Sequence, residues 1–286
     1  KKRSSVLDSV SLLVLRSAHL QRLVLSNVGA RQEFFLHFSQ CLELNPAQAL
    51  HSLDLSGNAL EDKGVIALAS ALRLLPNGIR SLNLGNCGFG PRGATILGKA
   101  IRANVQTPTT LNSLVLKDNA ILADGVQSVL ELLQGPNVLD TLDLSNTGCM
   151  GEQVLAWLHT GVYEQLAVLG LAGNKFTVKK AKEYRPPPTL AQVFQTAGSL
   201  RVVDLSDSKI PPEGLKAIFA GCSSNALLTK LQLNLSGCDL ESAAASALMD
   251  YLPRLPCLHR LDLSNNGKKT KNKQKKAKKE DQKQEV

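Results

Sequence analysis

The sequence predicts an α/β solenoid in which short parallel strands line a concave face and helices cover the convex face. The prediction rests on an eleven-residue pattern that recurs along the chain and on the room for a helix after each copy. The pattern is clearest at residues 50–60, where Leu53 and Leu55 alternate with polar residues and Asn58 follows them. Such alternation is typical of a short strand with one buried face. The whole pattern is that of a leucine-rich repeat, and the expected shape is a horseshoe like that of ribonuclease inhibitor.

An aliphatic residue occupies the first position of the pattern in nine successive copies. Their spacing of about 27 to 34 residues leaves room for a strand, a turn and a full helix in each repeat. One repeat cannot bury its own apolar face, so the copies must stack side by side with their strands parallel. The nine residues are Leu20, Leu50, Ile79, Leu111, Leu139, Leu166, Leu200, Leu228 and Leu258.

A helix is predicted after each strand. In several repeats a glycine precedes apolar residues at helical spacing, as Gly64 does with Leu68 and Leu72. We expect the backbone to turn tightly into the helix at that glycine. The equivalent glycines in other repeats are Gly93, Gly125 and Gly214. These segments predict one solenoid of about nine repeats over residues 20–267, with residues 1–19 as the helical end of a preceding repeat.

Composition agrees with a solenoid. The 286 residues are 43% hydrophobic but only 4% aromatic, as a core of repeated leucines requires. No apolar run approaches the ~18 residues that a membrane span needs. The chain starts at Lys1 without a signal peptide, and we expect it to be a piece of a longer protein. Cys87 and Cys238 stand at the ninth position and Cys149 at the eleventh, which favours reduced, buried thiols in an intracellular protein.

The positive charge is concentrated at the chain ends. The formal net charge is +9, of which residues 268–286 contribute +6 and the first three residues +3, so the solenoid itself is neutral. We predict that residues 268–286 form a disordered lysine-rich tail. Anionic lipid, nucleic acid, a nuclear import receptor or no specific partner are the alternatives for this tail. We predict no specific nucleic-acid site in the solenoid.

No enzymatic site is predicted. Residues 93–99 fit the spacing of a phosphate-binding loop, but Ala100 replaces the Ser or Thr that would hold magnesium, and the apolar periodicity there is that of a helix. The five histidines are dispersed, and no Cys or His group has the spacing of a zinc site. We therefore predict no catalytic residue, no cofactor and no metal.

The concave face is the predicted binding surface. Side chains at the fifth and seventh positions point away from the core there and form columns of short acids, amides and hydroxyls that suit a partner with Lys, Arg or backbone donors. The alternative is that Asp and Ser occur there because strand ends and tight turns accept them. The candidate residues are Asp54, Asn83, Val115, Lys117, Asp143, Asp204, Asn234 and Asp262.

A third column stands at the ninth position. Asparagines there can bond backbone groups of neighbouring turns, and we expect them to stabilise the stack rather than bind a partner. Cys87, Thr147, Ser208 and Cys238 replace asparagine in other repeats and are expected to bridge the turns less fully. The asparagines are Asn58, Asn119, Asn174 and Asn266.

The repeats Leu53-Asp-Leu-Ser-Gly-Asn58 and Leu142-Asp-Leu-Ser-Asn-Thr147 resemble the repeat domain of the CARMIL family, large cytosolic linkers of actin capping protein. Two irregularities are also similar to that family over residues 6–267. One is a basic, proline-bearing insertion after Phe176, and the other is a strand lengthened by two residues at 231–235. The insertion provides a second candidate surface, for anionic lipid or an acidic partner: Lys179, Lys180, Lys182 and Arg185.

The resemblance implies a non-enzymatic scaffold module of a regulator of actin capping protein and actin filament assembly, active in lamellipodia and cell migration. It also implies partners in the actin-regulatory machinery and a cytoplasmic location at the plasma membrane or leading edge. The family's capping-protein motifs lie outside these residues, and further repeats are expected after Gly267. The alternative is an independent ribonuclease-inhibitor-type or Ran-GTPase-activator-like repeat protein that binds another protein. The concave-face partner and the oligomeric state stay open.

Overall fold

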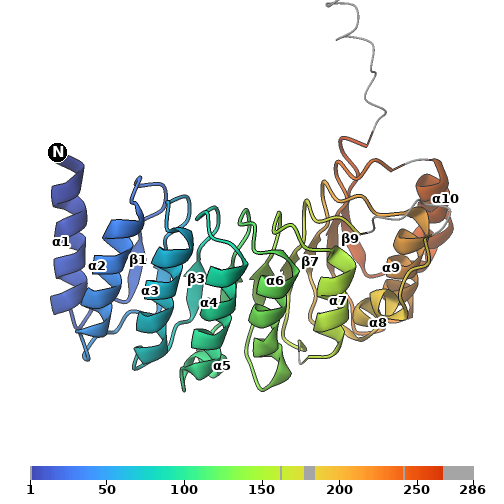
Figure 1. Ribbon diagram of the computed structural model, residues 1–286. Helices are drawn as coiled ribbons and strands as arrows, with labels where there is room; N and C mark the ends of the chain where they lie inside the picture. Colours follow the sequence, from blue (N-terminus) through green and yellow to red (C-terminus); the bar gives the residue numbers. More distant parts are fainter. Residues whose placement is uncertain (1, 162, 177–183, 241, 267–286) are drawn as a thin grey trace, which may run out of the picture.

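The structure, a computed structural model, describes residues 2–161, 163–176, 184–240 and 242–266. Short strands alternate with helices along these residues, and the strands form one parallel sheet in sequential order from β1 to β9. The helices stand in a row on one side of the sheet, and the array curves from α1 at one end to α10 at the other (Figure 1). The predicted leucine-rich repeat solenoid is therefore confirmed.

Each strand lies where the leucine pattern predicts it. The strands are β1 (Arg22–Val24), β2 (Ser52–Asp54), β3 (Ser81–Asn83), β4 (Ser113–Val115), β5 (Thr141–Asp143), β6 (Val168–Gly170), β7 (Val202–Asp204), β8 (Leu231–Asn234) and β9 (Leu258–Asp262). The fourth-position leucines are in register, since Leu53 pairs with Leu82 and Leu82 with Leu114. Equivalent residues of successive repeats thus form columns across the sheet.

The convex side is built from helices of different lengths. The α-helices are α1 (Lys2–Arg16), α2 (Gln32–Glu43), α3 (Glu61–Leu74), α4 (Pro91–Ala103), α5 (Thr107–Thr110), α6 (Leu122–Leu130), α7 (Gly151–His159), α8 (Pro188–Thr196), α9 (Pro212–Ser224) and α10 (Ser242–Tyr251). Two 3-10 helices, η1 (Glu131–Gln134) and η3 (Leu252–Arg254), follow α6 and α10.

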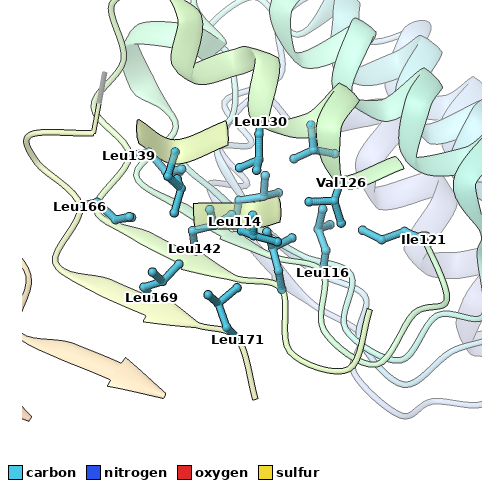
Figure 2. Close-up of a cluster of buried hydrophobic side chains, with 14 of the residues drawn as sticks. Leu114, Leu116, Ile121, Val126, Leu130, Leu139, Leu142, Leu166, Leu169 and Leu171 are labelled. Carbon is cyan, nitrogen blue, oxygen red and sulfur yellow. The ribbon is translucent and has the colours of Figure 1, made fainter. Parts of the chain in front are cut away.

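The core lies between the strands and the helices as one continuous cluster. Figure 2 shows Leu114, Leu142 and Leu169 from adjacent strands gathered beneath Val126 and Leu130 of α6. Each of these leucines from the strands is completely buried. Burial of one such side chain contributes about 1.5–3 kcal/mol. All six cysteines are also buried, and none forms a disulfide.

The irregular strand lies where the sequence places it. β8 has four residues and β9 has five, whereas β1 to β7 have three each. A register shift between Leu231 and Gln232 accommodates the extra residues, because Leu231 pairs with Leu258 while Gln232 pairs with Arg260. The extension in β8 is one residue rather than the expected two. A bulge of this kind adds a residue to one strand and locally increases the twist.

The role predicted for the helix glycines is wrong. Gly64, Gly93, Gly125 and Gly214 lie inside the first turns of α3, α4, α6 and α9 and not at a tight turn. A Cβ atom at Gly125 would lie 2.9 Å from Cβ of Ala94 in the neighbouring helix. Gly125, and Gly93 beside Asp62 of α3, therefore let adjacent helices approach closely.

A left-handed turn recurs at the eighth position of the repeats, and left-handed residues also stand at the entry to α3 and α6, at Glu61 and Leu122. All nine repeats have a left-handed backbone at the eighth position, with φ between 52° and 69°. Gly adopts this conformation readily because it has no Cβ to approach the carbonyl oxygen, and Asn and Asp adopt it more often than other residues because their short polar side chains form local hydrogen bonds. The nine residues are Asn27, Gly57, Asn86, Asp118, Asn146, Gly173, Asp207, Gly237 and Asn265.

Candidate protein-binding face

The fifth-position side chains first serve the turn that follows each strand. Oδ1 of Asp204 accepts a hydrogen bond from the backbone N–H of Ser206 at 2.9 Å. This bond links a side chain to the backbone two residues later, which is the pattern of an Asx turn. Equivalent bonds join Asp54 to Ser56, Asn83 to Gly85, Asp143 to Ser145, Asn234 to Ser236 and Asp262 to Ser264. The turn that follows each strand therefore uses one side-chain oxygen of each of these polar residues.

At the N-terminal end of the concave face the second oxygen is also occupied. Oδ2 of Asp54 accepts a hydrogen bond from Nδ2 of Asn83 at 3.0 Å. The hydroxyl of Ser56 donates to Oδ1 of the same aspartate at 2.6 Å. Val115 then interrupts the polar column, and Lys117 beside it is exposed. This end is the less available part of the column for a partner.

At the C-terminal end three of the candidates come together. Asp204, Asn234 and Asp262 lie on adjacent strands and line a concave cavity of about 180 Å³. The other lining residues are Val202, Val203, Gln232, Leu233 and Arg260. Hydrogen bonds from the N–H and hydroxyl of Ser264 hold the pKa of Asp262 below its ordinary value. The cavity therefore combines an anionic carboxylate with an amide and a cation.

The basic segment stays a prediction. Lys179, Lys180 and Lys182 lie outside the residues that the structure describes. Arg185 is exposed, and its Nη1 donates a hydrogen bond to the backbone carbonyl of Tyr184 at 3.0 Å. Tyr184 is buried, and burial together with the nearby Glu152 carboxyl raises the pKa of its hydroxyl. This ring anchors the chain just before α8.

The segment with the phosphate-loop spacing is helix α4, and its N-terminus is already occupied by a protein carboxylate. The backbone N–H groups of Gly90 and Gly93 both donate to Oδ1 of Asp62, at 2.9 and 3.0 Å. A carboxylate from the neighbouring helix thus occupies the N-terminus of α4, where a phosphate would otherwise bind. In the described part of the chain, no group of three His, Cys, Asp or Glu side chains could hold a metal ion. Nor is any helix there long and apolar enough to cross a bilayer.

The predicted asparagine ladder at the ninth position is present. Asn58, for example, donates to the carbonyls of Leu25 and Leu55 at 2.7 and 2.8 Å. Cys87 makes only weaker contacts from its thiol, the shorter being 3.4 Å to the carbonyl of Leu55. The side chains of this column join neighbouring repeats by hydrogen bonds, as expected.

A second ladder at the helix ends was not predicted. Nδ2 of Asn104 donates to the carbonyls of Leu72 and Leu75 in the preceding repeat, and its Oδ1 accepts from the N–H of Thr107. Asn45 and Asn225 make equivalent bonds in their repeats. Each asparagine stands three residues after a buried helical residue, and that spacing could have identified the ladder.

The family model described as "CARMIL family, LRR domain" matches residues 1–274. A human protein named "Capping protein, Arp2/3 and myosin-I linker protein 3" is 37% identical over 266 residues, which is 92% of this chain and 19% of that protein. "Protein CARMIL" of Dictyostelium discoideum is 32% identical over 248 residues, 86% of this chain and 23% of that protein. The chain thus spans about a fifth of the length of these relatives.

Among solved structures, the repeat protein LegL7 of Legionella pneumophila aligns with 84% of this chain and 81% of its own chain, at 18% identity and a TM-score of 0.41.

Proposed function

The chain belongs to the CARMIL family, as part of its leucine-rich repeat domain, and from that premise we propose that it is a non-enzymatic scaffold module of an actin regulator. In this proposal the module acts within a longer protein that regulates capping protein and actin filament assembly during cell migration. We expect it to work in the cytoplasm at the plasma membrane. The name of the human relative links capping protein, the Arp2/3 complex and myosin-I. Family membership favours this proposal over an independent inhibitor or GTPase-activator-like protein.

The concave cavity between β7 and β9 carries the proposal. Asp204 and Asp262 each give one oxygen to an Asx turn and line the cavity with the rest of the carboxylate. Repeat proteins present such concave faces as extended binding surfaces. We infer that the partner places Lys or Arg side chains at these two carboxylates, with Asn234 between them as a hydrogen-bonding group.

The fold itself supplies a matched variant for the test. Asparagine occupies the fifth position naturally at Asn83 and Asn234, where its Oδ1 makes the same turn bond. The double variant Asp204→Asn/Asp262→Asn therefore removes two negative charges and keeps both turns. The control is Asp124→Asn/Asp250→Asn, which makes the same charge change at exposed positions on the convex helices α6 and α10.

Purified Arp2/3 complex, myosin-I and capping protein are each passed over the immobilised chain. We expect Arp2/3 complex or myosin-I to bind, with at least tenfold weaker affinity for Asp204→Asn/Asp262→Asn and unchanged affinity for the convex control. We expect capping protein not to bind, since the family motifs for it lie elsewhere. The proposal would be contradicted if the chain bound none of the three proteins, or if the concave and the convex variant lost the same amount of affinity. Retention of capping protein would place its binding site within these residues.

A further inference from the structure

The convex side carries an open groove between α3 and α4. Its floor is formed by the buried side chains of Ala69 and Ala100, and the half-buried Ile66 and Ile96 form its apolar walls. The groove has a volume of about 360 Å³. The exposed residues Ser70, Arg73, Lys99 and Ala103 complete its rim.

The neighbouring gap between α4 and α6 is closed. A Cβ atom at Gly98 would lie only 2.5 Å from the carbonyl oxygen of Ser128, so the two helices are in close contact there. Arg102 spans the same gap, with its Nη1 2.6 Å from a carboxylate oxygen of Glu131 and 2.8 Å from the carbonyl of Ser128. Among the described residues, no ion pair joins α3 to α4. The contact printed between the two helices lies at the start of α4, where Oδ1 of Asp62 on α3 accepts hydrogen bonds from the backbone N–H groups of Gly90 and Gly93.

The two cations at the groove, Arg73 and Lys99, are available to a ligand. Arg73 and Lys99 are exposed, and neither forms an ion pair or side-chain hydrogen bond within the part of the chain that the structure describes. The helix α4 has no acidic residue, and Arg92 is a further basic side chain on it beside Lys99, whereas Arg102 is paired with Glu131. An apolar floor beside unpaired cations is complementary to a ligand that is apolar on one side and acidic on its flank.

We propose that this groove binds an acidic amphipathic helix of a partner protein. Apolar side chains one turn apart on that helix occupy the space over Ala69 and Ala100, and its carboxylates pair with Arg73 and Lys99. This is the helix-in-groove mode, in which apolar anchors recur at i, i+3 or i+4 and i+7. The site is separate from the concave face, so it holds whether or not the concave proposal does.

A lipid surface fits the groove less well. Recognition of an anionic membrane needs a cluster of about four to eight Lys or Arg residues on one face. Here exposed carboxylates lie on the groove helix α3, at Glu61, and on the flanking helices α2 and α6, at Glu43 and Asp124. A bilayer would bring its negative surface against these carboxylates, whereas a single helix would contact only the groove.

The test uses two phage-displayed libraries of sixteen-residue amphipathic helices with the same apolar positions. One library has Asp and Glu on the flank and the other has Lys and Arg. We expect the whole chain to enrich the acidic library only. A selected peptide, measured by fluorescence anisotropy, should bind at least tenfold more weakly to Arg73→Glu/Lys99→Glu and to Ser70→Trp, which covers the groove without changing its charge.

The control is Arg201→Glu/Lys230→Glu, which makes the same charge change at exposed positions before β7 and β8. Circular dichroism checks that each variant is folded. The proposal is overturned if neither library is enriched, if the basic library is enriched, or if the control loses as much affinity as the groove variants. It is also overturned if phosphatidylserine vesicles bind through Arg73 and Lys99 while the peptides do not.

Discussion

Asn119 donates a hydrogen bond from its side-chain amide to the backbone carbonyl of Leu84 in the preceding repeat, at 2.8 Å. The same nitrogen donates to the carbonyl of Leu116, and its Oδ1 accepts from the N–H of Cys87 at 2.8 Å. One buried side chain therefore satisfies backbone groups on both sides of a repeat boundary. Such groups would otherwise be buried without partners, since the turn offers them none.

The substitution Asn119→Ala should loosen the array at this boundary. Each backbone group left unsatisfied costs about 1–3 kcal/mol, so the free energy of unfolding in urea and the melting temperature should both fall. Asn112→Ala is the control, because Asn112 is exposed and donates one bond to the carbonyl of Val138. Partner binding on the concave face should be unchanged in both variants. An unchanged melting temperature for Asn119→Ala would show that the ladder does not stabilise the stack.

The second ladder should act locally at the helix ends. Asn104→Ala removes the acceptor for the backbone N–H groups of Gln106 and Thr107, which it binds at 2.9 Å each. Hydrogen exchange at these two amides should become at least tenfold faster, because exchange reports local opening. Gln106→Ala changes an exposed side chain in the same turn and serves as the control. Equal exchange rates in the two variants would contradict this role for Asn104.

Much of the fold could be predicted because one strong signal repeats. The fourth- and sixth-position leucines, such as Leu53 and Leu55, are buried in the structure as their alternation requires. The eighth-position turns were missed because Gly, Asn and Asp share that column. No single residue type repeats there, although all three tolerate the left-handed backbone.

The surfaces were harder to predict than the core. The sequence places Asp204, Asn234 and Asp262 in one column, but the cavity that they line is a feature of the folded surface that the column alone does not predict. The convex groove lies over the buried alanines Ala69 and Ala100, which in the sequence resemble any other core alanine.

A side chain at Gly57 should destabilise the turn. Its φ is +69°, and a Cβ atom there would collide with Oδ1 of Asn27 in the preceding repeat. Gly57→Ala should lower the free energy of unfolding by at least the ~1–2 kcal/mol that a left-handed backbone costs. Gly135→Ala, at φ −137° and with no atom within 4 Å of the added Cβ, should be neutral or slightly stabilising.

A double variant separates the two causes of strain at Gly57. Asn27 also has a left-handed backbone, so Asn27→Gly is compatible with its conformation. Adding Asn27→Gly to Gly57→Ala should restore the stability that is lost through the collision with the Asn27 side chain. The stability lost through the left-handed backbone at residue 57 should not be restored. Urea unfolding of the four proteins gives the coupling energy. A coupling energy of zero would mean that the collision contributes nothing.

Two buried thiols should make the protein less stable at alkaline pH. Burial raises the pKa of Cys87 and of Cys238 from 9.0 to about 11. In the unfolded chain these thiols lose their protons above pH 9, whereas in the folded protein they keep them until pH 11. The folded state then binds more protons, so stability is fully present below pH 9 and falls as the pH rises toward 11. The slope is at most about 1.4 kcal/mol per pH unit for each thiol.

Serine provides the matched replacement for these thiols. Ser208 occupies the ninth position naturally, and its hydroxyl donates to the carbonyl of Leu171 in the preceding repeat, as the thiol of Cys238 does to the carbonyl of Leu205. Cys87→Ser/Cys238→Ser should therefore keep the contact with the preceding repeat and remove the two titrating groups. Urea unfolding at pH 8, 9.5 and 10.5 should show a smaller loss of stability in this variant than in the unsubstituted chain. Parallel losses would mean that other groups cause the alkaline instability, because only the two thiols differ between the proteins.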